Sequence, residues 1–149
     1  MDRRKLFDQM NKDKKDSVEK EGFLHWDITQ KIIGCAMEVH NNLGNGFQEV
    51  IYQKALAMEM DAIGLSYVRE MGLPIIYKGE EIGLRRADFF VEQKVMVELK
   101  AVSKLENIHL AQAINYLQVS NTDIGLLINF GTPSLTFKRV KKPDSHKSY

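Results

Sequence analysis

The spacing of apolar residues predicts two helices in the first half of the chain. Residues 28–43 and 48–63 carry apolar side chains at the three- and four-residue intervals of a helix buried along one face. The glycine-containing stretch 41–46 separates the two helices, and Gly64 follows the second as a stop signal. The apolar face expected for the second helix includes Val50, Ala55, Leu56, Met58 and Met60.

The middle of the chain shows the pattern of short β-strands, three or four in number. Polar stretches at 78–80 and 92–94 interrupt the apolar residues and predict turns. The strands expected between and around these turns are 67–70, 73–77, 82–90 and 94–101. The last two would form an antiparallel hairpin around residues 92–93.

The last third of the chain predicts one more helix and two more strands. Residues 107–119 have helical spacing, and residues 135–140 form a final short strand. The stretch 123–130 is almost continuously apolar, which favours a central strand paired in parallel and buried on both faces. The order ααβββαββ, with a helix crossing between two strands, predicts an α/β fold with a mixed central β-sheet flanked by helices.

Composition indicates one domain with charged ends. The 149 residues are 44% hydrophobic and 28% charged, which is ordinary for a globular protein. Residues 1–22 are expected to form a charged N-terminal arm, either disordered or helical, residues 23–140 the folded domain, and residues 141–149 a basic C-terminal tail. The net charge of +1 means that any attraction to nucleic acid must come from local patches.

Cysteine content and hydropathy exclude several classes of protein. Cys35 is the single cysteine, so an intrachain disulfide and a cysteine-based zinc site are ruled out, and we expect this thiol to be buried. No apolar run approaches the roughly 20 residues that span a bilayer. The polar start of the chain does not read as a secretory signal. A cytoplasmic protein without a membrane segment is therefore expected.

Two acids in unusual surroundings mark the candidate site. Asp88 and Glu98 each interrupt an apolar strand, and Lys100 shares a face of its strand with Glu98 because side chains alternate. The predicted hairpin would place Asp88 beside Glu98. Paired carboxylates repel each other unless a cation such as Mg²⁺ lies between them. Lys100 would then orient or deprotonate an attacking water, or stabilise charge on a phosphate.

A structural explanation for each of these residues is also open. Either acid would form an interstrand salt bridge with Lys100, Arg85 or Arg86 in that case. Glu49 opens a helix after a glycine turn, where it would point toward a site or simply favour the positive end of the helix dipole.

Several short motifs resemble those of a known family. Residues 46–52 read G-x-x-E-x-x-Y, residues 86–88 read Arg-Ala-Asp, and residues 97–100 read Val-Glu-Leu-Lys. With these motifs the chain resembles the GxxExxY protein family, which is placed in the PD-(D/E)XK nuclease superfamily. The resemblance covers residues 28–140 and implies a restriction-endonuclease-like core within 23–140.

The resemblance implies a role for each acid and for the lysine. Asp88 and Glu98 would be metal ligands, and Lys100 would be the catalytic lysine. Glu49 would be the acid contributed by the first core helix and a third metal ligand. The implied cofactor is Mg²⁺ or Mn²⁺.

Four further residues are candidates for supporting the site or binding substrate. Gln112 and Tyr116 match the Q-x-x-x-Y pattern of RecB-like nucleases and share one helix face, although ordinary packing explains them equally well. His109 would support the site or contact substrate, or else cap a helix or lie at the surface. Tyr52 would brace Glu49 or simply be buried in the core.

Three functions follow from these features. The first is a metal-dependent nuclease that hydrolyses phosphodiester bonds, with DNA favoured over RNA. The second is a non-catalytic module on a nuclease fold that binds nucleic acid or a protein partner. The third is a structural or oligomeric protein, such as a homodimer, in which the apolar stretches 126–130 and 135–137 pair between subunits at sheet edges.

Overall fold

The computed structural model describes residues 3–8 and 23–144 and confirms the predicted α/β fold class. Residues 3–8 are helical. The elements that follow are α2 (Trp26–Leu43), α3 (Glu49–Ala62), β1 (Tyr67–Tyr77), β2 (Glu80–Val91), β3 (Val95–Lys100), α4 (Asn107–Ser120), β4 (Ile124–Asn129) and β5 (Thr136–Lys141). The predicted order ααβββαββ is therefore confirmed. The parts of the predicted arm at 1–2 and 9–22, and of the tail at 145–149, lie outside the described residues.

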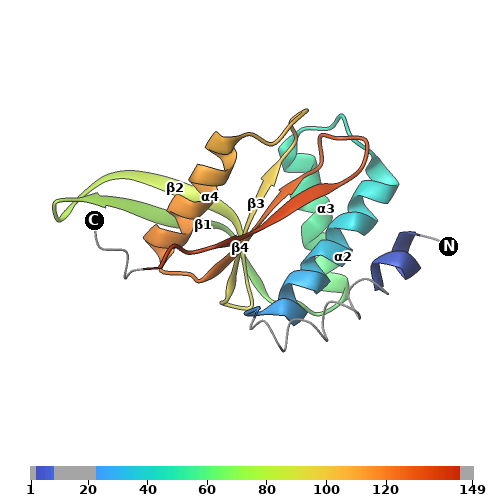
Figure 1. The fold of residues 1–149 in the computed structure, drawn as a ribbon, viewed down its shortest axis with the longest axis horizontal. Coiled ribbons are helices and arrows are strands. Elements are labelled where there is room, and N and C mark those ends of the chain that lie inside the picture. The colour runs from blue at the N-terminus through green and yellow to red at the C-terminus, as the bar shows by residue number, and fades with distance from the viewer. Residues whose placement is uncertain (1–2, 9–22, 145–149) are drawn as a thin grey trace.

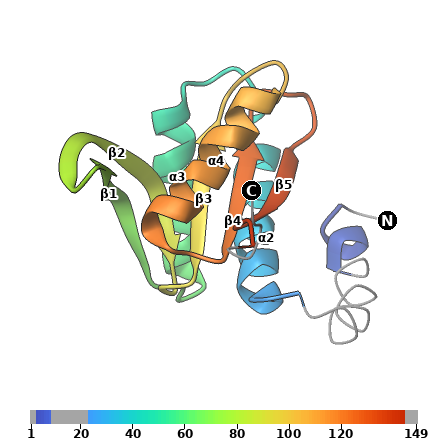
Figure 2. The ribbon, with the colours of Figure 1, turned by 60° about the vertical axis from the view of Figure 1, so that its left-hand side comes forward.

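The five strands form one mixed sheet in the order β1-β2-β3-β4-β5. Strands β3 and β4 are parallel, and the other neighbouring pairs are antiparallel. Helices α2 and α3 cover one face of the sheet, and α4 covers the other (Figures 1 and 2). All six residues of β4 are buried, so the prediction of a central strand paired in parallel is confirmed.

Each face of the sheet has its own core. Phe89, Val97 and Leu126 are among the strand residues that pack with α2 and α3, whereas Met96 and Leu127 pack with α4. The alternation along β3 and β4 thus assigns successive side chains to opposite layers.

Close packing of α4 against the sheet depends on a glycine. A Cβ atom at Gly125 would lie 3.1 Å from Leu117 Cδ2 and 3.2 Å from the carbonyl oxygen of Met96. Only a residue without a side chain lets α4 approach β4 this closely.

Strand β1 differs from its prediction. The two strands expected at 67–70 and 73–77 are one strand with an irregularity at Glu70, which has a positive φ of 53°. The register runs from Arg69 opposite Phe89 to Met71 opposite Ala87, so Glu70 lies across from Asp88.

At this irregularity the ribbon of β1 and β2 changes its buried face. Phe89 packs in the core beneath α2 and α3, whereas Ala87, two residues earlier, packs in the core beneath α4. Beyond this twist, β1 and β2 extend as a two-stranded arm away from the body of the molecule (Figure 1). The sequence alone predicted a break between residues 70 and 73. Pairing with β2 continues on both sides of that break, so the structure has a single strand.

Two predictions about exposure are wrong. The stretch 126–130 does not form a sheet edge, because β4 pairs with β3 on one side and β5 on the other. On α3, Val50 and Met58 are 45% and 72% exposed. Leu56 and Met60 are buried as expected, and Tyr52, Gln53 and Ala57 complete the buried stripe.

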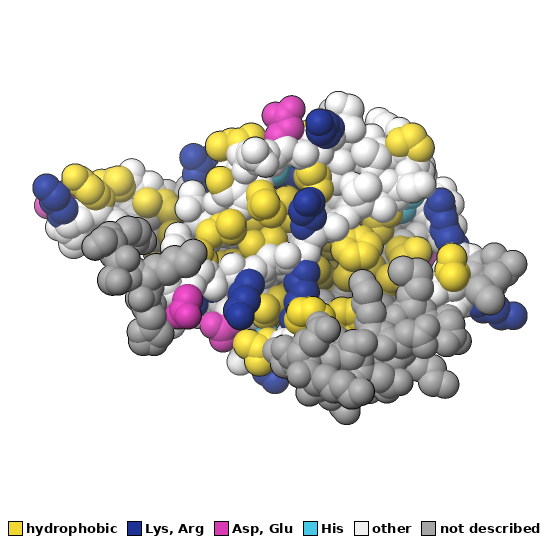
Figure 3. All heavy atoms as spheres, in the orientation of Figure 1, with side chains coloured by type: hydrophobic (Ala, Val, Ile, Leu, Met, Phe, Trp, Pro, Cys, Tyr) yellow, Lys and Arg dark blue, Asp and Glu magenta, His cyan; other side chains and the backbone are white. Residues whose placement is uncertain are grey.

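One face of the molecule mixes basic and apolar side chains. Basic side chains are spread singly over the face seen in Figure 3, with apolar side chains between them. Within residues 3–8 and 23–144, no helix combines the length and apolar character needed to cross a membrane.

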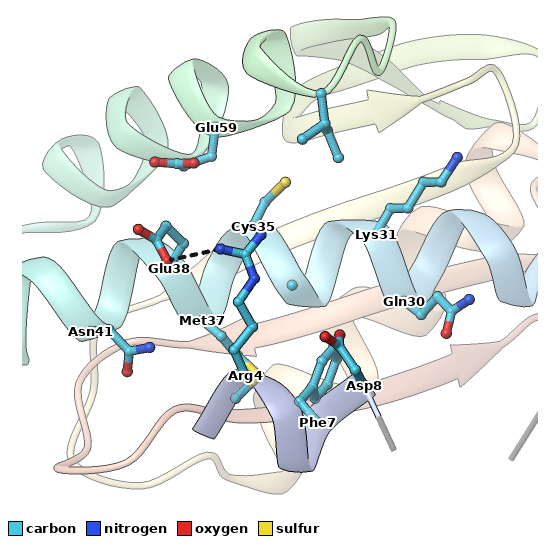
Figure 4. Close-up of a pocket in the computed structure, with 12 residues that line it drawn as sticks. Arg4, Phe7, Asp8, Gln30, Lys31, Cys35, Met37, Glu38, Asn41 and Glu59 are labelled. Atoms are coloured by element: carbon cyan, nitrogen blue, oxygen red, sulfur yellow. Dashed lines mark ion pairs between the residues drawn. The ribbon is translucent and has the colours of Figure 1, made fainter. Parts of the chain in front are cut away.

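The predicted burial of Cys35 is confirmed, since the residue is 5% exposed. It lines a cavity of about 550 Å³ between residues 3–8, α2 and α3, together with Glu38 and Glu59 (Figure 4). Burial and the charge of Glu59 raise the pKa of the Cys35 thiol to about 11. The thiol is therefore protonated at neutral pH and is a poor nucleophile.

We predict that Gly125→Ala destabilises the protein by about 1–3 kcal/mol, because the added methyl group overpacks the contact between α4 and β4. Gly83→Ala is the matched control on β2, where a Cβ atom would meet Ile75 only at 3.9 Å. Urea unfolding of both variants measures the difference. Equal stabilities for the two variants would contradict the packing argument.

Candidate active site

Strands β2 and β3 stop pairing at the point where the two predicted acids lie. The ladder between them has three pairs, and the last of these is Phe89 opposite Val97. The next pair would be Asp88 and Glu98, as the predicted hairpin requires. Here side chains replace the ladder: Asp88 N donates to Glu98 Oε1 at 3.1 Å, and Leu99 N donates to Asp88 Oδ2 at 2.8 Å.

The Asp88 carboxylate is held from two directions. Besides the Leu99 amide on Oδ2, its Oδ1 accepts a hydrogen bond of 2.7 Å from Gln53 Nε2 on α3. Burial raises the pKa of Asp88, and these two hydrogen bonds partly offset that rise. The carboxylate is thus fixed in position while its ionised form is poorly solvated.

Glu98 is more strongly affected than Asp88. It is 9% exposed, and burial followed by the negative charge of Asp88 raises its pKa to about 8. Two adjacent buried carboxylates therefore resist carrying two negative charges together. A bound cation would remove this conflict.

Lys100 and Glu49 complete the electrostatic surroundings. Lys100 ends β3 on the same face as Glu98, and its carbonyl oxygen accepts a hydrogen bond of 2.8 Å from Phe130 N. Glu49 is the first residue of α3. Burial raises the pKa of Glu49, the charge of Lys100 lowers it, and the charge of Asp88 raises it.

The alternative explanation by salt bridges is not supported by the geometry. Within the part of the chain that the structure describes, no nitrogen of Lys100, Arg85 or Arg86 lies within 4.0 Å of a carboxylate oxygen of Asp88 or Glu98. The two acids interact with each other's strand instead of with a basic partner.

The donor set fits a hard divalent cation in part. Asp88 and Glu98 are adjacent carboxylates, the ligand type that Mg²⁺ prefers, and Mg²⁺ usually takes one or two carboxylates with waters and substrate phosphates. Among residues 3–8 and 23–144, however, no group of three or more His, Cys, Asp or Glu side chains is close enough to hold a metal ion. Two of the three predicted ligands therefore meet, and Glu49 acts on them through longer-range charge.

Comparison with known proteins identifies the family. The model of a family described as the PD-(D/E)XK nuclease superfamily matches residues 26–140. This chain belongs to the PD-(D/E)XK nuclease superfamily. Nucleases of this superfamily generally use divalent metals.

A solved structure and the curated proteins add little to this assignment. The crystal structure of SSO0001 aligns with a TM-score of 0.48 and 18% sequence identity, over 64% of this chain and 50% of that one. The chain thus spans half the length of SSO0001. No curated protein matches the chain.

Helix α4 brings one of the predicted supporting residues toward the acids. Burial, and after it the charge of Glu98, raises the pKa of the Tyr116 hydroxyl. Gln112, one turn earlier on α4, is exposed. Of the two residues of the predicted Q-x-x-x-Y pattern, Tyr116 thus packs against the core beneath α4, and Gln112 lies at the surface.

His109 and Tyr52 both have structural contacts. His109 Nδ1 accepts a hydrogen bond of 2.9 Å from the Glu106 amide in a capping box at the start of α4. Tyr52 is fully buried and stacks on Phe130 at 4.5 Å, and its hydroxyl donates to Gly44 O at 2.6 Å. Tyr52 thus braces the turn before α3, not the Glu49 side chain.

Two polar residues near the site were absent from the sequence-based prediction. Gln53 is 4% exposed and lies one turn after Glu49 on α3, so an amide within the buried stripe was the available signal. Asn129 is fully buried; its Oδ1 accepts from Val102 N at 3.0 Å and its Nδ2 donates to Val102 O at 2.9 Å. It thereby fixes the chain that leaves β3 after Lys100.

We predict that Glu98→Gln stabilises the metal-free protein at pH 8 by about 1–3 kcal/mol, with no stabilisation below pH 4.5. The folded-state pKa of Glu98 is about 8 and the ordinary value is 4.5. Between these values the folded state keeps a proton that the unfolded state releases, so stability falls as pH rises. The amide avoids this loss and still accepts the hydrogen bond from the Asp88 amide.

Chemical unfolding at pH 4 and pH 8, in the presence of a chelator, measures the effect. Glu81→Gln is the control. Glu81 is exposed near the start of β2, so this change should alter stability little at either pH. The same stabilisation at both pH values for Glu98→Gln would show that charge burial is not its cause.

Proposed function

We propose that this chain is a metal-dependent nuclease of the GxxExxY family that hydrolyses phosphodiester bonds, with DNA as the favoured substrate and RNA as the alternative. The observation that carries the proposal is the exchange of side-chain and backbone hydrogen bonds between Asp88 and β3, which holds two carboxylates together where the β2–β3 ladder ends. Membership in the superfamily supplies the nucleic-acid substrate class.

The surroundings of the three acids suggest a role for each in metal binding. Asp88 and Glu98 would hold Mg²⁺ or Mn²⁺, with Glu49 adding negative charge from α3. Such an ion supplies polarisation of a phosphoryl oxygen and a more acidic water. Burial is the first cause of the raised pKa of all three carboxyls, and a cation bound among them would favour their ionised forms.

Lys100 is assigned the role of catalytic lysine. This assignment is supported by its place at the end of β3, on the face that carries Glu98, and by its charge, which lowers the pKa of Asp88, Glu98 and Glu49. There it would orient the attacking water and offset negative charge that develops on the phosphate. Tyr116 would contact substrate or the acids from α4.

One observation favours the second candidate, a non-catalytic module that binds nucleic acid. Within the described residues the three predicted acids do not gather into a ready metal site. A nuclease with this arrangement must complete the site with substrate phosphate and water, whereas a module would need no metal at all.

We predict that Mg²⁺ or Mn²⁺ supports DNA cleavage and that a chelator abolishes it. Lys100→Ala should lower the cleavage rate by about 100-fold or more while leaving Mn²⁺ binding within a few-fold of the wild type, because the lysine stabilises the transition state and is not a ligand. Asp88→Asn should weaken Mn²⁺ binding itself. Calorimetric titration and cleavage of single- and double-stranded DNA and RNA provide the measurements.

Glu81→Gln on the exposed arm serves as the control for both assays. Nucleic-acid binding without cleavage and without heat from Mn²⁺ would reject the nuclease and support the module. Cleavage that survives Lys100→Ala unchanged would point to a contaminating nuclease.

A further inference from the structure

A buried amide connects an arginine to the proposed metal ligand Asp88. Gln53 Nε2 donates to Asp88 Oδ1 at 2.7 Å, and Gln53 Oε1 accepts from Arg69 Nε at 2.8 Å. Gln53 lies on α3, Arg69 on β1 and Asp88 on β2. Three consecutive elements of the chain therefore meet at one carboxylate.

Arg69 determines which way the Gln53 amide points. If the amide were rotated by 180°, its oxygen would face the Asp88 carboxylate and its NH₂ group would face the guanidinium. Both contacts would then be repulsive, since two acceptors and two donors would oppose each other. The arginine thus keeps the NH₂ group of Gln53 directed at Asp88. Gln53 itself is only 4% exposed.

The fold places Arg69 for this contact. Arg69 pairs with Phe89, which packs in the core beneath α2 and α3, so this part of β1 shares that side of the sheet with Gln53. The next residue, Glu70, has its positive φ of 53°, and Met71 after it packs beneath α4. The twist at Glu70 therefore separates Arg69, which acts on Asp88 through Gln53, from the two-stranded extension of β1 and β2.

We propose that Gln53 and Arg69 are positioning residues that fix the Asp88 carboxylate for a divalent cation. Each carboxylate oxygen has two acceptor positions, and Asp88 uses one on Oδ1 for Gln53 and one on Oδ2 for the Leu99 amide. The second position on each oxygen is left for an ion and its waters. This inference rests on the proposed function, because it assigns the purpose of the arrangement to metal binding.

The test compares Mn²⁺ affinities by calorimetric titration of full-length variants. Gln53→Met keeps the size and shape of the side chain but removes both hydrogen bonds. It should weaken Mn²⁺ binding by about 10-fold, the lower end of the range for residues that orient metal ligands. Arg69→Met should weaken binding less, because Gln53 stays and only its orientation becomes free.

Two controls separate positioning from general damage to the fold. Leu56→Met changes a fully buried α3 residue with little change in volume and should leave Mn²⁺ affinity unaltered. In an Asp88→Asn background, Gln53→Met should cause no further loss of Mn²⁺ affinity, because the carboxylate that it positions is gone. Thermal unfolding of each metal-free variant verifies that it is folded.

A second double-mutant cycle needs no metal. The melting temperatures of Gln53→Met, Asp88→Ala and the double variant, measured with a chelator, should be non-additive if the two side chains interact. Additive shifts would overturn the proposal.

Unchanged Mn²⁺ affinity in Gln53→Met would also overturn it, and would leave Gln53 a purely structural residue. If the wild-type protein binds no Mn²⁺, the proposed function fails and the positioning role fails with it. Coupling in the metal-free cycle would then show that the contact itself was correctly assigned.

Discussion

The arrangement of the site depends on how two backbone amides are satisfied where β2 and β3 diverge. A buried N–H group without an acceptor is costly, so strands rarely separate inside a protein unless something replaces their ladder. Here the carboxylates of Asp88 and Glu98 accept from the amides of Leu99 and Asp88. The same two hydrogen bonds thus let the strands separate and hold the two carboxylates side by side. Both acids therefore have a hydrogen-bonding role in the fold.

Burying the two carboxylates lowers the stability of the folded state, and packing elsewhere in the fold offsets this loss. Glu98, with a pKa of about 8, opposes folding as an ion, and Asp88 adds to the cost. Around them the fold is closely packed. A Cβ atom at Gly131 would lie 2.3 Å from the backbone of Val102, so only glycine permits the contact that, with Asn129, anchors the end of β3. Rigid surroundings of this kind are what keep like charges from moving apart.

The sequence was informative where the determinants are local. The apolar run of β4, the turn at 92–93 and the alternation that sets Glu98 and Lys100 on one face all follow from spacing. The twist at Glu70 and the contact of Arg69 with Gln53 depend on pairing with β2 and packing of α3, which no local pattern encodes. Likewise, a histidine at the third position of a helix is compatible with a cap and with a ligand. Only the hydrogen bond with the Glu106 amide distinguishes the two for His109.

The opening between β2 and β3 also explains how both layers of helices reach one point. Glu98 follows Met96 by two residues and so faces the α4 side, where burial and then the charge of Glu98 raise the pKa of Tyr116. Asp88, in contrast, accepts its hydrogen bond from Gln53 on the α3 side. In an intact sheet Asp88 would pair with Glu98 and both side chains would lie on the α4 side, because residues directly opposite on neighbouring strands share a face. Because the ladder ends at Phe89, the carboxylates lie in the gap itself, and residues from α3 and α4 can act on the same pair. The site is therefore a property of the local opening in the sheet more than of either helix.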